Sequence, residues 1–397
     1  MLSKFKEGLS KNVVVLGIVS GLTDISSEML YPVIPIFLNS VLNAPMSIIG
    51  LVEGIAEATA SILKIYGGYL SDKFKKRKSF VVLGYSLSSV SKPLMAVASS
   101  WYLVLFARFI DRVGKGIRTS PRDALIASSV SKQHWGKAFG FHRAMDTLGA
   151  AIGPLITLLL IWKLGETPSS YRYIFTISFI PALAGVFILI KYISEKNNND
   201  ANLEINKRIS LFSFSKDFKI FITISTIFFL FKFSDAFFIM KAKKTGFSTS
   251  GVIWVYFFYN ILYTILSTPA GVLADRLGKA KLFTSGFLVF AIVCVMFSIA
   301  NTKETITAAF AVYSLYGALN EGIAKAVISS LTQEENRATA MGVYHSLTGI
   351  SLLFSSIIAG LLWDRFSPST PFLISAVISA AITLTSLIWI KIRRIYI

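Results

Sequence analysis

Long apolar segments recur along the chain, each close to the length of a membrane-crossing helix. A helix needs about 20 mostly apolar residues to cross the hydrocarbon core of a bilayer. Proline, glycine and clusters of charge separate the segments, which fall at 12–37, 47–70, 79–98, 101–127, 136–163, 171–193, 217–241, 249–274, 281–300, 304–330, 337–363 and 369–391. We therefore predict an all-α membrane protein with 12 transmembrane helices.

The composition excludes an ordinary water-soluble domain. Of the 397 residues, 54% are hydrophobic and only 15% are charged. A net charge of +19 would suggest nucleic-acid binding in a soluble protein, but most basic residues here lie in short loops or inside the apolar segments. The single cysteine, Cys294, lies in an apolar segment and cannot form an intrachain disulfide. No small-residue cleavage site follows the basic N-terminal flank, so we expect the first segment to be retained.

The longest polar interruption divides the chain into two parts. The Asn-rich stretch 194–210 separates the first six apolar segments from the last six. We predict an N-terminal bundle over 1–193, a cytoplasmic linker over 194–215 and a C-terminal bundle over 216–397. Lys and Arg concentrate in the loops on the side of both termini, which places that side in the cytoplasm. We expect a multi-pass protein of a bacterial or archaeal plasma membrane, the inner membrane of the cell.

A repeat relates the two parts. The stretch GYLSDK at 68–73 recurs as GVLADR at 271–276, a shift of 203 residues. The same shift maps Arg122 to Lys325. Two parallel six-helix halves follow, related by an axis along the membrane normal, with a binding site expected near mid-membrane between them.

Both copies of this repeat resemble the loop motif of the major facilitator superfamily, Gly-x-x-x-Asp-Arg/Lys-x-Gly-x-Lys/Arg. The second copy is intact, whereas Lys75 stands at the second glycine position of the first, so we expect a different turn there. The resemblance implies a conformational gate, because the glycine allows two helices to approach and the Asp can pair with basic groups or a helix dipole in one bundle arrangement. The gating residues are Gly68, Asp72, Lys73, Gly271, Asp275 and Arg276.

Two further stretches resemble motifs of the same superfamily. In the fourth predicted helix, Arg108 matches an arginine-containing motif, although Asp111 and Arg112 replace its usual Gln and Gly. In the fifth, GAAIGP resembles the Gly-x-x-x-Gly-Pro motif found mostly in antiporters. The resemblance covers essentially the whole chain and implies two pseudo-symmetric six-helix bundles of an antiporter-like branch, with helix packing at Gly149, Gly153 and Pro154.

The fourth predicted helix carries a stripe of charge. Its charged residues recur every three or four positions, which confines them to an arc of roughly 120°. Charge at the centre of a span costs at least about 2.5 to 3.5 kcal/mol per residue, so the stripe is expected to face water or polar partners rather than lipid. Its members are Arg108, Asp111, Arg112, Lys115, Arg118 and Arg122.

Other predicted helices carry polar groups that the resemblance places around the same cavity. Helices 1, 4, 7 and 10 line the cavity in this superfamily, so we expect one polar chamber. The alternative is that the acids and bases neutralise one another and hold the helices in register. The groups are Asp24, Glu28 and Tyr31 in helix 1, Glu53, Glu57 and Lys64 in helix 2, Lys232 and Asp235 in helix 7, and Glu321 and Lys325 in helix 10.

Proton coupling requires a carboxylate or histidine whose protonation changes as a cavity opens. Asp24 and Glu28, four residues apart on one helix face, are the first candidates, and Asp111, His142 and Asp146 follow. The alternative for His142 is a hydrogen-bonded histidine that packs helices together.

The sequence therefore predicts a secondary active transporter that works by alternating access and is coupled to protons. Bases outnumber acids on the charged stripe, which favours a small anionic or zwitterionic solute. The alternative, which the antiporter-like motif permits, is a multidrug efflux antiporter for hydrophobic compounds. A receptor or scaffold is a further class, but we expect no large cytoplasmic domain of the kind that a sensor carries.

No metal cluster, nucleotide loop or nucleophile triad stands at convincing spacing. We therefore expect no enzyme activity, no cofactor and no metal. The expected partners are a small-molecule substrate, protons and the lipid bilayer, with no nucleic acid, and we expect a monomer.

Overall fold

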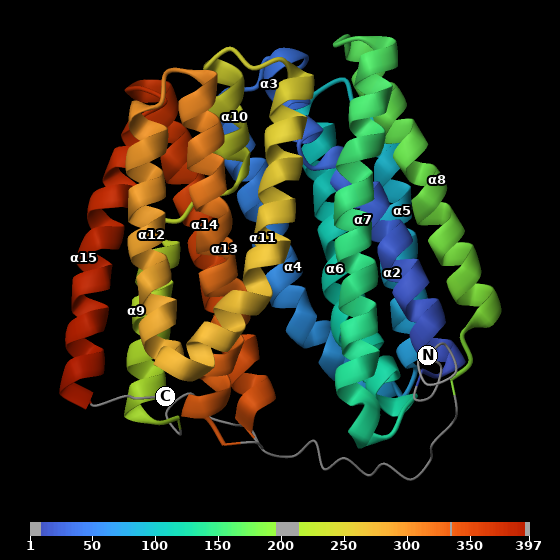
Figure 1. The fold of residues 1–397 in the computed structure, drawn as a ribbon. Coiled ribbons are helices and arrows are strands. Elements are labelled where there is room, and N and C mark those ends of the chain that lie inside the picture. The colour runs from blue at the N-terminus through green and yellow to red at the C-terminus, as the bar shows by residue number, and fades with distance from the viewer. Residues whose placement is uncertain (1–8, 196–213, 334–335, 394–397) are drawn as a thin grey trace. The chain divides into compact units, whose positions relative to one another are not determined.

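The computed structural model describes residues 9–195, 214–333 and 336–393 (Figure 1). Regular structure within these ranges is helical and includes no strand. The predicted all-α class is confirmed.

The helices follow the predicted apolar segments. Two segments, 12–37 and 217–241, are each divided into two helices. The first half of the chain forms α2 (Lys11–Leu30), α3 (Val33–Ser40), α4 (Met46–Phe74), α5 (Arg77–Ala96), α6 (Trp101–Ser128), the short η1 (Lys132–His134), α7 (Trp135–Leu164) and α8 (Pro168–Tyr192). The second half forms α9 (Lys216–Phe229), α10 (Ala236–Lys244), α11 (Thr249–Leu277), α12 (Lys279–Ile299), α13 (Lys303–Leu331), α14 (Arg337–Arg365) and α15 (Thr370–Arg393).

Among the described residues, 8 helical spans are long and apolar enough to cross a membrane by length and composition. They are α2 with α3, α4, α7, α8, α11, α12, α14 and α15. The other predicted spans do not meet this criterion, for two physical reasons. Helices α5, α6 and α13 are long but rich in polar and charged side chains, and α9 and α10 are each too short after their interruption.

The chain divides into two compact units. The first comprises Met1–Leu42 and Ile55–Ile205, and the second comprises Asn43–Gly54 and Asn206–Ile397. Helix α4 thus contributes its first turns to the second unit and its remainder to the first. Most of the predicted linker, residues 196–213, lies outside the described residues.

In the first unit, α2 packs against α7 and α8, while α5 packs against α6 and α8 (Figure 1). The core between them is apolar and includes Val13, Leu16, Val19, Val81, Leu125 and Leu189. This arrangement positions α6, which carries the charged stripe, directly beside α5.

Glycines bring two helix pairs of the first unit into backbone contact. A Cβ atom added at Gly149 would lie 2.5 Å from the carbonyl oxygen of Gly21, and one at Gly153 would lie 2.7 Å from that of Ile25. Helix α7 therefore contacts α2 at the two glycines of the GAAIGP motif, and Pro154 beside them is buried. Gly114 of α6 makes a similar contact with the Gly84 carbonyl of α5.

In the second unit, α12 packs against α13 and α15, and α11 packs against α13. The core here is aromatic. The rings of Phe238 and Tyr313 stack with centroids 4.4 Å apart, and those of Phe228 and Phe287 stack at 4.2 Å. These side chains are buried and hold the unit together.

The first turns of α4 pack on α14 within this second unit. The Asp364 carboxylate accepts hydrogen bonds from the backbone N–H groups of Met46 at 3.0 Å and Ser47 at 2.8 Å. It therefore caps the N-terminus of α4. A Cβ atom at Gly54 would lie 2.9 Å from the Cα atom of Leu353, so the two helices meet closely there as well.

Two interruptions divide helical segments. The first, between α2 and α3, coincides with Tyr31 and Pro32, as the proline predicts. The second, over 230–235, has no proline or glycine and was not predicted. Its backbone groups are bonded by side chains from other helices: Ser375 donates to the Phe231 carbonyl at 2.6 Å, and Ser356 accepts from the Ser234 N–H at 3.1 Å. Such partners permit irregular backbone within a membrane protein.

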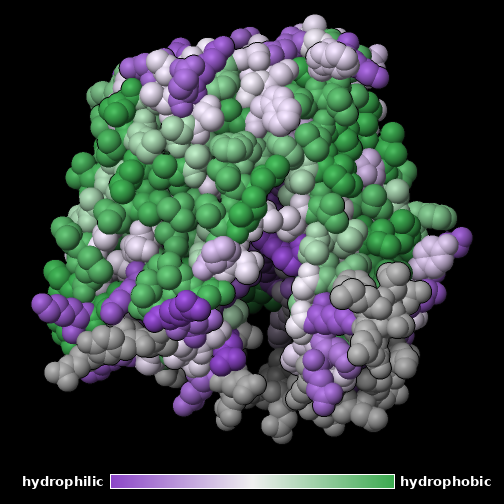
Figure 2. Space-filling view, in the orientation of Figure 1, coloured by the Kyte–Doolittle hydropathy of each residue, from purple (hydrophilic) through white to green (hydrophobic). Residues whose placement is uncertain are grey.

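The outer surface of each unit suits a lipid environment. Hydrophobic side chains cover the middle of the helices on the visible face, and hydrophilic ones gather at the helix ends (Figure 2). Large exposed apolar side chains include Trp162 and Phe187 in the first unit, and Leu384 and Ile392 in the second. Apolar surface of this extent marks a membrane-facing region.

Candidate functional site

The charged stripe of α6 is anchored by a buried ion pair with α5. Lys92 Nζ lies 2.8 Å from Asp111 Oδ1, and the two side chains are 1% and 7% exposed. The other carboxylate oxygen, Oδ2, lies 3.9 Å from Arg108 Nη1 and 4.0 Å from Arg112 Nε. Asp111 thus forms its hydrogen bond with Lys92 and interacts with the two arginines at longer range.

Arg112 pairs with a carboxylate of α4. Its Nη2 atom lies 3.1 Å from Glu57 Oε1. The guanidinium is buried, while the Glu57 side chain is 33% exposed. This pair links α4, the second predicted span, to the charged stripe of α6.

Two cations of the stripe have no carboxylate within ion-pair distance among the described residues. The Lys115 side chain is exposed, and its ammonium forms no hydrogen bond within the described part of the chain. Arg118 is buried and lies 4.4 Å from the centre of the Tyr85 ring, with Nη1 donating to Ser88 Oγ. A cation–π contact and a hydroxyl partner stabilise the guanidinium but do not neutralise it.

Asp24 of α2 lies near these cations, and Glu28 lies near Asp24. The Asp24 carboxylate is within electrostatic range of Asp146, Lys115, Glu28 and Arg118. The side chain is half-buried and accepts no hydrogen bond from a described residue. The first unit therefore brings carboxylates of α2 and α7 together with the stripe of α6. Tyr31, at the end of α2, is half-buried.

The last residue of the stripe, Arg122, pairs with a carboxylate of its own helix. Its Nη2 atom lies 2.8 Å from Asp123 Oδ1, and Nη1 donates to Ser20 Oγ at 3.3 Å. On α7, His142 Nδ1 lies 3.4 Å from Asp146 Oδ2. His142 Nε2 and Asp146 Oδ1 are buried without a hydrogen-bond partner in the described structure.

The second unit places three polar groups at the interruption between α9 and α10. Lys232 Nζ lies 2.9 Å from Asp235 Oδ1, and the Tyr313 hydroxyl of α13 donates to the same oxygen at 2.6 Å. Lys325 lies further along α13 than Tyr313, and its side chain is exposed. The Glu321 side chain lies outside the described residues, so the predicted place of Glu321 and Lys325 in the cavity stays a prediction.

The two copies of the loop motif differ. Asp72 pairs with Arg77 at 2.9 Å, and exposed Lys73 lies beside it, whereas Asp275 lies 3.9 Å from Lys279 next to exposed Arg276. The turn of the first copy departs from the second, as predicted: Lys75 has a φ of 52°, and Gly278 has a φ of 98°. Lys75 thus adopts a left-handed conformation that favours glycine.

The two copies also differ in the packing around their first motif glycine. A Cβ at Gly68 would lie 3.1 Å from Ser120 Cβ, and the neighbouring Gly67 is closer still, at 2.6 Å from the Ile117 carbonyl oxygen. Around Gly271, no atom of the described structure lies within 4 Å of such a Cβ. Gly271 lies on an exposed part of α11, and its gating role stays a prediction.

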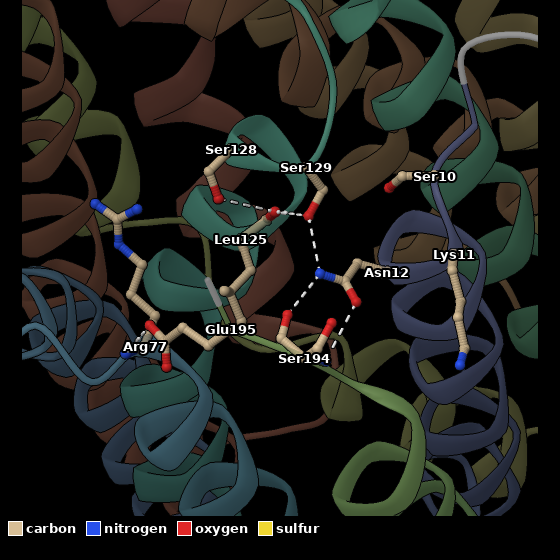
Figure 3. Close-up of a pocket in the computed structure, with 9 residues that line it drawn as sticks. All are labelled: Ser10, Lys11, Asn12, Arg77, Leu125, Ser128, Ser129, Ser194 and Glu195. Atoms are coloured by element: carbon tan, nitrogen blue, oxygen red, sulfur yellow. Dashed lines mark hydrogen bonds between the residues drawn. The ribbon is translucent and has the colours of Figure 1, made fainter. Parts of the chain in front are cut away.

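A polar pocket of about 300 Å³ lies elsewhere in the first unit, at the helix ends (Figure 3). Asn12 donates to the Ser194 carbonyl at 2.8 Å, and the Glu195 carboxylate accepts from the Arg77 and Lys78 N–H groups at 2.8 and 2.9 Å. Its polar groups are occupied in tying the end of α8 to α2 and α5. It is separate from the charged stripe.

Sequence reasoning missed Lys92. A single lysine near the end of the predicted segment 79–98 gave no periodic signal, and its proximity to Asp111 depends on the packing register of α5 and α6. Metal ligands do not group in the described residues: no cluster of three or more His, Cys, Asp or Glu side chains could hold an ion there.

Comparison with known proteins establishes the family. The model of the Major Facilitator Superfamily matches residues 16–240 and 220–396. The chain belongs to the major facilitator superfamily. An MFS-type transporter of Methanocaldococcus jannaschii, itself uncharacterized, is 39% identical over 379 residues, which is 94% of this chain and 93% of that protein.

Solved structures of the superfamily share the fold. The nucleoside transporter NupG aligns with a TM-score of 0.80 at 13% identity, covering 96% of this chain and 99% of NupG. The human organic anion transporter MFSD10 aligns with a TM-score of 0.66 at 13% identity, covering 95% of this chain and 99% of MFSD10. The major facilitator fold of two pseudo-symmetric bundles is therefore confirmed, and the chain is a membrane-embedded transporter of small molecules rather than an enzyme.

Proposed function

We propose that this transporter carries a small anionic or zwitterionic solute by alternating access. The observation that supports the proposal is Lys115, an exposed ammonium on the charged stripe with no carboxylate within ion-pair distance among the described residues. Arg118, one turn further on, likewise has no carboxylate partner there. A solute carboxylate or phosphate would supply the missing negative charge, and Asp24 and Glu28 would face the ammonium of a zwitterion.

In this proposal Asp24 couples the solute to protons. Asp24 and an incoming anion compete for the same positive charge at Lys115. Protonation of Asp24 releases Lys115 for the solute, and loss of the solute favours the ionised carboxylate again. Glu28, Asp146 and His142 are the further proton carriers, whereas Asp111 is held by Lys92 and is less suited to that role.

The remaining residues take supporting roles. Lys232 and Asp235, at the interruption of a helix, form the counterpart of the site in the second unit, as discontinuous helices do in other transporters. Asp72 and Asp275 gate the pathway. The chain acts as a monomer in a plasma membrane, with both termini and the linker 194–215 in the cytoplasm.

Flux measurements on protein reconstituted in liposomes test the proposal. Uptake of labelled succinate, phosphate and alanine is compared for the wild type, Lys115→Gln and a matched control, Lys163→Gln, an exposed lysine at the end of α7. Loss of a charged hydrogen bond predicts a transport efficiency for Lys115→Gln about 10 to 100 times lower, with Lys163→Gln unchanged. Equal rates for the two variants would refute the anion site.

Two further arms separate the alternatives. An imposed pH gradient that leaves uptake unchanged contradicts proton coupling. Export of hydrophobic cations that is insensitive to Lys115→Gln favours the efflux antiporter. One relative, the multidrug resistance protein MdtH of Enterobacter, is 27% identical over 108 residues, or 27% of this chain.

A further inference from the structure

Side chains of alternating charge form a row through the first unit, from a buried end to an exposed end. Lys92, almost fully buried, holds Asp111 at 2.8 Å. Asp111 faces Arg112 at 4.0 Å, and Arg112 pairs with Glu57 at 3.1 Å. Glu57 is within electrostatic range of Lys115, and Lys115 is within range of Asp24. The row therefore begins at Lys92, which is buried away from any solute, and leads to Lys115, the cation proposed to contact the solute.

Lys92 and Arg112 compete for the same carboxylate. Asp111 uses Oδ1 for Lys92, while Arg112 Nε stays 4.0 Å from Oδ2, beyond hydrogen-bond distance. Without Lys92, the buried Asp111 would lose its hydrogen-bonded cation and would attract the two guanidinium groups near its Oδ2 atom, Arg108 at 3.9 Å and Arg112 at 4.0 Å. Glu57 would then lose its partner and turn to Lys115.

We propose that Lys92 is a positioning residue that keeps Lys115 available to the solute by occupying Asp111. The inference rests on the proposed anion site. It predicts that neutralising Lys92 weakens anion binding although Lys92 itself never contacts the anion. It also predicts that removing the competing acid, Asp111, from the same variant restores binding.

A purely structural role for the pair predicts something else. The register of α5 on α6 has other supports: Gly84 contacts Gly114, and Ser88 donates to the Asp111 backbone carbonyl at 3.1 Å. If the ion pair only held the helices together, Lys92→Met would lower the stability of the protein and leave the chemistry of Lys115 unchanged. The reactivity of the Lys115 amine therefore distinguishes the two roles without requiring a known substrate.

The experiment uses the full-length protein purified in detergent, as wild type, Lys92→Met and Lys92→Met/Asp111→Asn. Trace acetylation with acetic anhydride, followed by peptide mass spectrometry, reports the reactivity of Lys115 relative to Lys163 in the same molecule. Binding of succinate and inorganic phosphate is measured in parallel. If Lys92→Met does not fold, Lys92→Gln replaces it, because the amide still donates to Asp111 but carries no charge.

We expect Lys115 acetylation to fall about fivefold in Lys92→Met and anion affinity to fall about tenfold, with both largely restored in the double variant. Unchanged Lys115 reactivity in Lys92→Met, or a double variant as impaired as the single one, overturns the inference. If the wild type binds neither anion but Lys115 acetylation still falls in Lys92→Met, the positioning role of Lys92 stands and the proposed anion site is refuted.

Discussion

Removal of one hydroxyl, in Ser375→Ala, tests how the interruption between α9 and α10 is maintained. Ser375 is 3% exposed, and its hydroxyl donates to the Phe231 carbonyl at 2.6 Å. The variant leaves that buried carbonyl without its donor, which costs about 1 to 3 kcal/mol. Ser379→Ala is the matched control, since Ser379 lies one turn further on the same helix, is fully buried and has a hydroxyl without a hydrogen-bond partner in the described structure.

Thermal unfolding of the purified protein in detergent measures the difference. Both variants delete the same atom from α15, so their comparison removes the effect of the deleted atom itself. At about 2 to 4 °C per kcal/mol for a unit of this size, Ser375→Ala should melt roughly 2 to 12 °C below Ser379→Ala. Ser379→Ala should match the wild type or exceed it slightly, because it removes an unsatisfied polar group. Equal melting temperatures for the two variants would refute this account of the interruption.

Three other predictions follow from the packing and the turns. Gly149→Ala should destabilise the protein by about 1 to 3 kcal/mol relative to Gly140→Ala in thermal unfolding. An added Cβ lies 2.5 Å from the Gly21 carbonyl oxygen at position 149, whereas it has no described atom within 4 Å at position 140. Equal stability of the two variants would contradict the backbone contact. Lys75→Gly should stabilise the protein by about 1 kcal/mol by removing the cost of its φ of 52°, whereas Lys73→Gly, inside α4, should destabilise it by a similar amount. Tyr313→Phe should lose the 2.6 Å bond to Asp235 and cost about 0.5 to 1.5 kcal/mol in the same assay, and no loss would show that Lys232 suffices as a partner.

The predicted spans and the observed helices agree because apolar length is a local property of the sequence. The break at Pro32 was equally local, since proline disrupts a helix wherever it stands. The break over 230–235 was not, because its determinants, Ser356 and Ser375, lie more than 120 residues away and act only after the helices pack. Nothing in the segment itself distinguished it from a continuous helix.

The candidate site shows the same limit. Periodicity correctly grouped Arg108, Asp111 and Arg112 on one face of α6, but it gave no pairing between helices. Lys92 was missed for that reason, since a lone lysine in an apolar segment acquires meaning only when the register of α5 on α6 is known. Arg122 was placed on the stripe by the same periodicity, yet it forms an ion pair with its sequence neighbour Asp123.

The backbone contact at Gly149 and Gly153 has a consequence for how protons and solute are linked. Asp24 and Glu28 lie on α2 beside these glycines, and Asp146 lies one turn before Gly149 on α7. Two helices that touch main chain to main chain cannot slide or roll independently, so these three carboxylates keep their mutual spacing as the unit moves. The electrostatic environment of the three carboxylates can then change only when groups outside α2 and α7 move. All three carboxylates would respond to such a movement together.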